Sequence, residues 1–193
     1  MQEIVQAIRQ EHRNTLSLLH VLARQVEAFA RGKVPDYDVI RATVDYFLTF
    51  PDQVHHPKED LVFARLRERD AAAAAAIGDL REAHEELAAR TREFAEGLEA
   101  VLDELEIPRS AFVHRAGRFI ELQRRHIEME ERSFLPAAET ALMAEDWTAL
   151  AARMTRGQDP LFGARVSPRF ERLRRTILAW QAQDELVADK DGA

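Results

Sequence analysis

The chain has 193 residues, of which 46% are hydrophobic and 32% are charged, and its formal net charge is −7. This length suits one domain with a core of its own. The absence of cysteine excludes disulfides, iron–sulfur clusters and thiolate metal sites. The negative charge argues against non-specific binding to nucleic acid, which requires a basic surface.

The sequence also lacks the signals that direct a protein to a membrane. No apolar run approaches the length of a membrane-spanning helix. The first residues carry neither the basic segment nor the apolar segment of a signal peptide. We therefore expect no membrane association and a cytoplasmic location.

Helix-forming residues dominate the sequence, and no stretch alternates in the manner of a strand. The first helix is predicted over residues 2–31, where apolar residues recur at steps of three and four. A second helix begins at a cap, either Asp36 or Asp38, and continues to Arg69. Two prolines interrupt this segment, so we expect a kink or break near residues 50–54.

The next two helices are predicted from similar signals. The third spans residues 71–105 and ends before Pro108, because a residue that precedes proline leaves the helical region. The fourth begins near Ser110, and Pro136 ends or bends it.

Shorter elements complete the chain. A fifth helix is predicted over residues 147–156, capped by Asp146, and a sixth begins at the pair Ser167-Pro168. Four long antiparallel helices with short connections indicate an all-α fold, an up-down-up-down four-helix bundle on which the short fifth and the C-terminal sixth helix pack. The predicted organisation is a bundle over 1–145, a helical extension of the same domain over 146–188 and a flexible tail over 189–193.

Histidine and glutamate recur in a pattern that divides the bundle into two similar halves. In each half, a histidine on one helix is followed 42 or 43 residues later by a second histidine, which opens the motif H-x-x-x-E-[D/E]-x-x-F. The members of this internal repeat are His12, His55 and Glu59 in the first half, and His84, His126 and Glu130 in the second.

The spacing of the repeat has a physical meaning. Residues i and i+4 lie one turn apart on the same face of a helix, so each motif directs an imidazole and a carboxylate to one point. His12 and His84 fall on the apolar stripes of their helices, so we expect all six side chains to face the core at a similar depth. Two unpartnered carboxylates in a core would cost several kcal/mol each, a cost that a pair of bound metal ions removes.

The donor atoms indicate the kind of metal. Imidazole and carboxylate without sulfur suit iron first, then zinc, manganese or copper. Each glutamate has two oxygens and can bridge two ions, and the remaining positive charge favours a bridging oxide or hydroxide. The alternative is structural, because core histidines are often hydrogen-bonded without a metal and H-x-x-x-E is common as a surface pair.

These motifs, over about residues 8–140, resemble the HHE, or hemerythrin-like, cation-binding family. The resemblance implies a four-helix bundle with a non-haem di-iron centre, in which the six repeat residues occupy the ligand positions and the two glutamates are the bridges. The pattern is also similar to that of proteins that repair iron centres under nitrosative stress.

The sequence departs from the oxygen-carrying members of this family. Those place two histidines one turn apart on the third helix, where Ala88 follows His84 here, and they end with H-x-x-x-x-D, where Glu130 stands at the fourth position here. These departures disfavour reversible O₂ carriage. His56 is an additional candidate: it lies about 100° around the helix from His55, and is a ligand of the second metal, a partner of a ligand or an exposed residue.

The function expected from these features is to bind or sense O₂, NO or peroxide, or to handle iron under oxidative or nitrosative stress. The alternative is an enzyme that consumes peroxide or acts as a di-iron oxidase, although the Glu-x-x-His motif of carboxylate oxidases is absent. A third class is a helical interaction protein with incidental histidines. The expected partner is a small diatomic ligand or peroxide, and the oligomeric state stays open.

Overall fold

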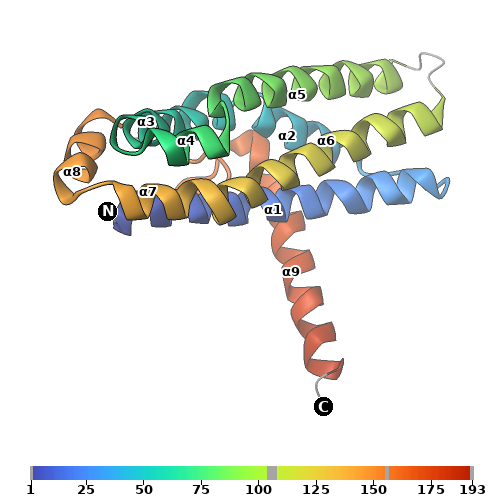
Figure 1. The fold of residues 1–193 in the computed structure, drawn as a ribbon. Coiled ribbons are helices and arrows are strands. Elements are labelled where there is room, and N and C mark those ends of the chain that lie inside the picture. Colours follow the sequence, from blue (N-terminus) through green and yellow to red (C-terminus); the bar gives the residue numbers. More distant parts are fainter. Residues whose placement is uncertain (1, 104–107, 155–156, 192–193) are drawn as a thin grey trace.

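Four helical segments lie side by side and alternate in direction in the computed structural model (Figure 1). The structure describes residues 2–103, 108–154 and 157–191, and these ranges contain no strand. The segments of the bundle are α1 (Gln2–Ala30), α2 with α3 (Tyr37–Phe47 and His56–Arg69), α5 (Leu80–Leu102) and α6 with α7 (Arg109–Met129 and Leu135–Ala141). The predicted all-α, up-down-up-down bundle is confirmed.

The connection between the first two segments follows from local chemistry. After α1 ends, Gly32 takes a φ of 78°, a left-handed conformation that glycine adopts without steric cost. Asp36 then caps α2, because its carboxylate accepts a hydrogen bond from the Val39 N–H at 3.2 Å. Of the two caps predicted from the sequence, Asp36 is the one that the structure uses.

The break expected near residues 50–54 is a π-helical turn. This turn, η1 (Pro51–His55), connects α2 to α3, and the N–H of His56 bonds to the carbonyl of Pro51, five residues earlier. Proline has no N–H to donate, so the α-helical hydrogen-bond pattern is already interrupted where the wider turn begins.

The third predicted helix is divided in two. α4 (Ala71–Ile77) ends at Gly78, whose φ is 98°, and α5 begins after Asp79, whose carboxylate caps its first turn. The prediction of one continuous helix over 71–105 is therefore wrong at this point, because a glycine in the left-handed region stops one helix and an aspartate cap starts the next. The predicted helix end before Pro108 falls on residues 104–107, outside the described residues.

The fourth segment also contains a π turn. α6 passes through η2 (Glu130–Phe134) into α7, so the helix continues beyond Pro136 and does not end there. Regular steps of three and four from His126 would bring Ser133 to the core. The π turn contains one residue more than an α turn, and Phe134 is buried instead, while Ser133 is exposed.

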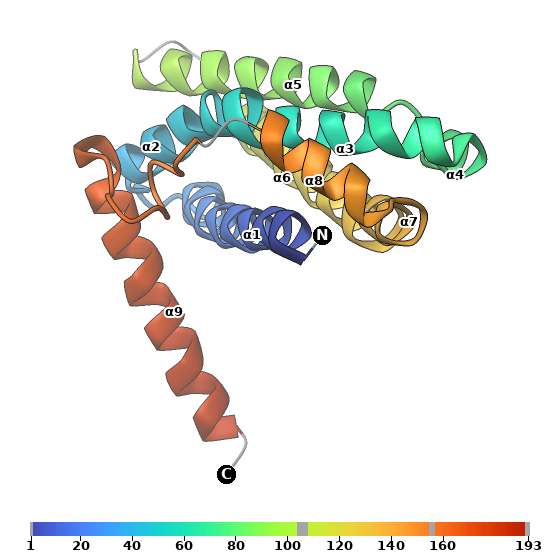
Figure 2. The ribbon, with the colours of Figure 1, turned by 90° about the vertical axis from the view of Figure 1, so that its left-hand side faces the viewer.

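Two further helices pack on the bundle. α8 (Ala144–Arg153) lies against α3 and buries Trp147. α9 (Glu171–Asp191) follows the 3₁₀ turn η3 (Pro168–Phe170), contacts α1 and α2 where it begins, and then leads away from the bundle (Figure 2). The end of the fifth helix predicted at residue 156 and the last residues of the predicted tail, 192–193, lie outside the described residues.

The apolar core consists of two clusters, one towards each end of the bundle. On α1, Ile8 belongs to one cluster and Leu18 to the other, and His12 lies between them. The other three segments repeat this order, so a polar layer crosses the bundle between the two clusters. This layer holds the histidines and glutamates of the sequence repeat.

Asp146 connects α8 to α3. Its buried carboxylate accepts hydrogen bonds from Arg65 Nε at 2.7 Å and from Arg69 Nε at 2.9 Å. The guanidinium of Arg69, with that of Arg65, holds the pKa of Asp146 well below its usual range. The sequence pattern predicts that Asp146 is the cap before residue 147. α8 instead begins at Ala144, and Asp146 bonds from the first turn to the Met143 N–H at 2.9 Å.

We expect Asp146→Asn to lower the melting temperature at neutral pH. The pKa is depressed in the folded state, so the stabilisation is present above the ordinary aspartate pKa of about 3.9 and is lost as the pH falls through the lower folded value. The melting temperatures of wild type and variant should therefore converge at the acid end of a pH series. Glu145→Gln, an exposed neighbour, is the control, and an equal loss in both variants or a difference that ignores pH would contradict this assignment.

Candidate metal centre

The six residues of the sequence repeat lie together in the polar layer. Glu59 and Glu130 are fully buried, and the four histidines are at most 9% exposed. Each segment of the bundle contributes at least one: His12 from α1, His55 and Glu59 from η1 and α3, His84 from α5, and His126 and Glu130 from α6 and η2. The expectation that they face the core at a similar depth agrees with this placement.

Two groups of candidate ligands can be distinguished, in each of which one nitrogen or oxygen atom per residue lies within 4.8 Å of all the others. The first position is formed by His12, His55, Glu59 and Glu130. The second position is formed by His56, Glu59, His84 and His126. Glu59 belongs to both, so the positions are adjacent. His56, an additional candidate in the sequence, is buried and belongs to the second position.

Imidazole nitrogens surround the two carboxylates. His12 Nε2 lies 3.2 Å from Glu59 Oε1 and 3.2 Å from Glu130 Oε2. His84 Nε2 lies 3.5 Å from Glu59 Oε2 and 3.5 Å from Glu130 Oε1. His126 Nε2 lies 2.9 Å from Glu130 Oε1. Both glutamates therefore face histidines from both halves of the sequence.

This arrangement changes the acidity of the groups. Burial alone lowers the pKa of a histidine, but the carboxylates of Glu130 and Glu59 outweigh burial and raise the pKa of His12 from 6.5 to about 11. The pKa of His84 is raised in the same way, against burial, first by Glu130. Burial raises the pKa of Glu130, but its histidine partners, His12 first, lower it well below the usual value. Protonated histidines can thus balance the buried carboxylates.

Three of the histidines direct their other ring nitrogen, Nδ1, to an outer carboxylate. The pairs are His12 with Glu131 at 2.7 Å, His55 with Glu11 at 2.8 Å and His84 with Asp60 at 3.0 Å. A carboxylate in this position fixes the orientation of an imidazole and leaves its Nε2 available for a metal. Cations hold two of the acids in turn, since Arg9 Nε lies 3.3 Å from Glu131 and Lys58 contacts Glu11.

The outer carboxylates connect the two halves of the repeat. Asp60 follows Glu59 and holds His84, whereas Glu131 follows Glu130 and holds His12. The acid after each central glutamate therefore orients the single histidine of the other half. This acid is part of the sequence motif, but the motif alone assigns it no role. Its recurrence in both copies was the available signal.

Several buried atoms of the layer have no hydrogen-bond partner. They include Glu59 Oε2, Glu130 Oε2 and His126 Nε2. Each of these atoms contacts a histidine or a carboxylate at 2.9 to 3.5 Å but not in hydrogen-bond geometry, which costs free energy in a core, and all three are potential metal ligands. Because the donor set is nitrogen and oxygen without sulfur, it fits iron, zinc or manganese. The residues present therefore fit a pair of metal ions.

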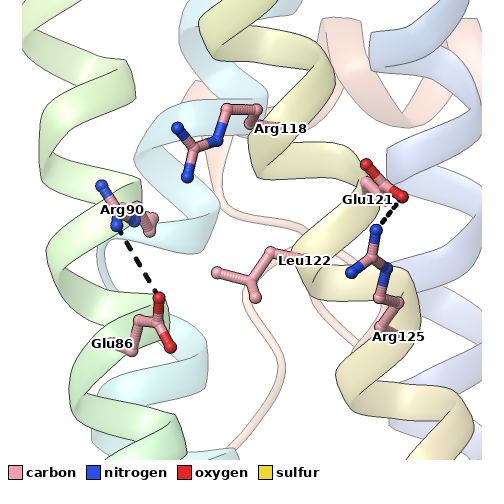
Figure 3. A pocket seen from close by; sticks show the side chains of 6 residues that line it. All are labelled: Glu86, Arg90, Arg118, Glu121, Leu122 and Arg125. Carbon is pink, nitrogen blue, oxygen red and sulfur yellow. Dashed lines mark hydrogen bonds and ion pairs between the residues drawn. The ribbon is translucent and has the colours of Figure 1, made fainter.

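A separate pocket of about 240 Å³ lies between α5 and α6 (Figure 3). Four of its charged side chains pair along their own helices, Arg90 with Glu86 at 3.8 Å and Arg125 with Glu121. None of its lining residues belongs to either position. We therefore place the candidate site in the buried layer and not in this pocket.

Comparison with known proteins agrees with the geometry. The family model of the hemerythrin HHE cation binding domain matches residues 3–138. This chain belongs to the hemerythrin HHE family. The resemblance recognised in the sequence over about residues 8–140 is thereby confirmed, and the match covers all six residues of the repeat. No curated protein and no solved structure matches the chain significantly. Among the described residues of this hemerythrin-like chain, no helix has the length and apolar character needed to cross a membrane.

The raised pKa of His12 can be measured directly by NMR titration of protein treated with a chelator. We expect His12 to stay protonated through the neutral and mildly alkaline range. Glu130→Gln removes one of the carboxylates that contact the His12 imidazolium, the others being Glu59 and Glu131, so it should lower the pKa of His12 by roughly 1 to 3. Glu128→Gln, an exposed residue near the end of α6, should leave this pKa unchanged. Titration of His12 near its ordinary value in the wild type would contradict the electrostatic assignment.

Proposed function

We propose that this hemerythrin-like protein holds two metal ions, iron in preference to zinc or manganese, in a non-haem dinuclear centre that binds O₂, NO or peroxide. The observation that carries the proposal is the pair of buried ligand groups that share Glu59. Membership of a cation-binding family and the unpartnered carboxylate oxygens support it.

The residues would divide the work as follows. Glu59, which belongs to both groups, and Glu130 would hold the ions together with His12 and His55 at the first position and with His84 and His126 at the second. The outer carboxylates hold three of these rings in place. When bound, a pair of iron ions supplies redox and coordination chemistry towards small oxygen and nitrogen ligands.

The packing around the layer favours a small ligand. Apolar side chains of the two clusters fill the bundle on both sides of it. Protein cores are packed as densely as organic crystals, so a larger organic molecule could not enter the layer between the two clusters without displacing core side chains. A ligand of two or a few atoms requires no such displacement. This supports the binding of a diatomic molecule or peroxide over the conversion of an organic substrate.

Metal content tests the first part of the proposal. Wild type loaded with iron should contain about two ions per chain, and Glu59→Ala and His126→Ala should lose most of them. Metal at 100 times its Kd should stabilise the wild type by about 2.7 kcal/mol, or roughly 5 to 11 °C in melting temperature for a chain of this size. His114→Ala, at an exposed histidine outside the layer, is the matched control.

The outcomes separate the two parts of the proposal. Equal metal content in the wild type and all three variants would refute the dinuclear centre. Normal metal content, with a visible spectrum that responds to none of O₂, NO and peroxide, would refute ligand binding while leaving the metal centre in place.

The outer carboxylates give an independent prediction. Glu131→Gln removes the charge that orients His12 and should weaken metal binding by about 10- to 100-fold. Glu139→Gln is a close control, because Glu139 also pairs with Arg9, at 2.9 Å, and does not contact His12. Competition with a chelator of known affinity measures both. Equal affinities of the two variants would show that Glu131 has no orienting role.

A further inference from the structure

The two positions differ in how their histidines are held. At the first position, His12 and His55 each bond to an outer carboxylate that is itself paired with Arg9 or Lys58. At the second position, only His84 has such a hydrogen bond, to the partly exposed Asp60. The second position therefore has the less firmly held set of rings.

His56 accounts for much of this difference. Its side chain is 9% exposed, and its Nδ1 is buried without a hydrogen-bond partner, 3.3 Å from a carboxylate oxygen of Asp52. The ring stacks on that of His84, with centroids 4.1 Å apart and planes inclined by 10°. A ring nitrogen of His56 lies within 4.8 Å of ligand atoms of Glu59, His84 and His126. A buried imidazole with a ring nitrogen this close to three metal-binding groups is itself placed as a ligand.

The second position also faces a pocket of about 340 Å³ that is open to solvent. His56 and His84 line it, and its rim carries Asp52, Asp60, Arg81 and Glu85. His12, His55 and Glu130, which belong to the first position, do not line it. The rim has three acidic groups and one basic group, so its field attracts cations. Ala88, which also lines the pocket, has only a methyl group there and leaves space beside the rings.

We infer that the two metal positions are unequal: His56 is a third imidazole ligand of the second position, and this position exchanges its ion through the acidic pocket over His56 and His84. The first position, held by paired carboxylates and away from this pocket, retains its ion. The inference rests on the proposed dinuclear centre and adds to it a seventh ligand and an entrance. It also places the exchangeable ion nearest to the solvent from which a small ligand arrives.

The test follows the removal of Fe(II) by a colorimetric chelator from the anaerobically loaded full chain. The wild type should release its iron in two phases of about equal amplitude. His56→Ala should speed the fast phase by at least about 10-fold, since it removes a direct ligand and not only an outer partner, and should leave the slow phase unchanged. His114→Ala should alter neither phase.

A second variant protects the test against misfolding of His56→Ala. Ala88→Leu adds apolar bulk at the wall of the pocket without touching the proposed ligand set, so it should slow the fast phase and leave the iron content at wild-type level. Circular dichroism of each variant checks that the helices are intact.

Each result has a distinct meaning. Wild type that binds no iron would refute the proposed function itself. Two bound ions with release phases that do not respond to His56→Ala would overturn the role of His56 and leave the dinuclear centre standing. Equal acceleration of both phases by His56→Ala, or no effect of Ala88→Leu, would overturn the inequality of the two positions or the entrance through the pocket.

Discussion

Two carboxylates that are fully buried between apolar clusters set the constraint on which this structure depends. Glu59 and Glu130 cannot remain charged in a core without positive or hydrogen-bonding partners, since burying an unpaired charge costs several kcal/mol, a large part of the stability of most domains. The histidines at one depth of the bundle meet this requirement. Protons on His12 and His84, or metal ions between the rings and the carboxylates, are alternative ways to supply the positive charge. With protons or with metal ions, the contacts between the histidines and the two glutamates hold the four segments of the bundle in one register.

The outer carboxylates make this layer a property of the whole bundle. Because Asp60 of the first half orients His84 of the second, and Glu131 of the second half orients His12 of the first, neither half completes its own ligand set. The rings reach their positions only when the segments pack against one another. Ligand binding in such a site is coupled to folding, and the preorganisation of the rings is supplied by contacts between helices far apart in the sequence.

The repeat residues were predictable because helical spacing and internal repetition are both visible in a sequence. An i, i+4 pair faces one point on any α-helix, and a second copy with the same context makes coincidence improbable. Local deviations were harder to predict. Gly78 lies within a run of good helix formers, and only its left-handed φ shows that the helix stops there. The partners of the histidines depend on which helices become neighbours. Glu11 directly precedes His12 and bonds to His55, but no acid directly precedes His84 in the second half, so the repeat does not identify Glu11 as a partner.

The two π turns explain why a repeat in sequence produces unequal positions in space. In the first half the π turn ends at His55, directly before His56, and both rings are buried. On a regular helix the side chains of these two residues would point about 100° apart. If one of them faced the core, the other would lie towards the edge of the buried face. In the second half the π turn begins at Glu130, after the motif histidine, and the residue that follows His126 is Ile127. The residue after the motif histidine therefore differs in effect between the halves. In the first half it is His56, which adds an imidazole beside His84, and in the second half it is Ile127, which adds an apolar side chain. Wider turns are common at functional sites, and here their offset separates a position with two imidazoles from one with three.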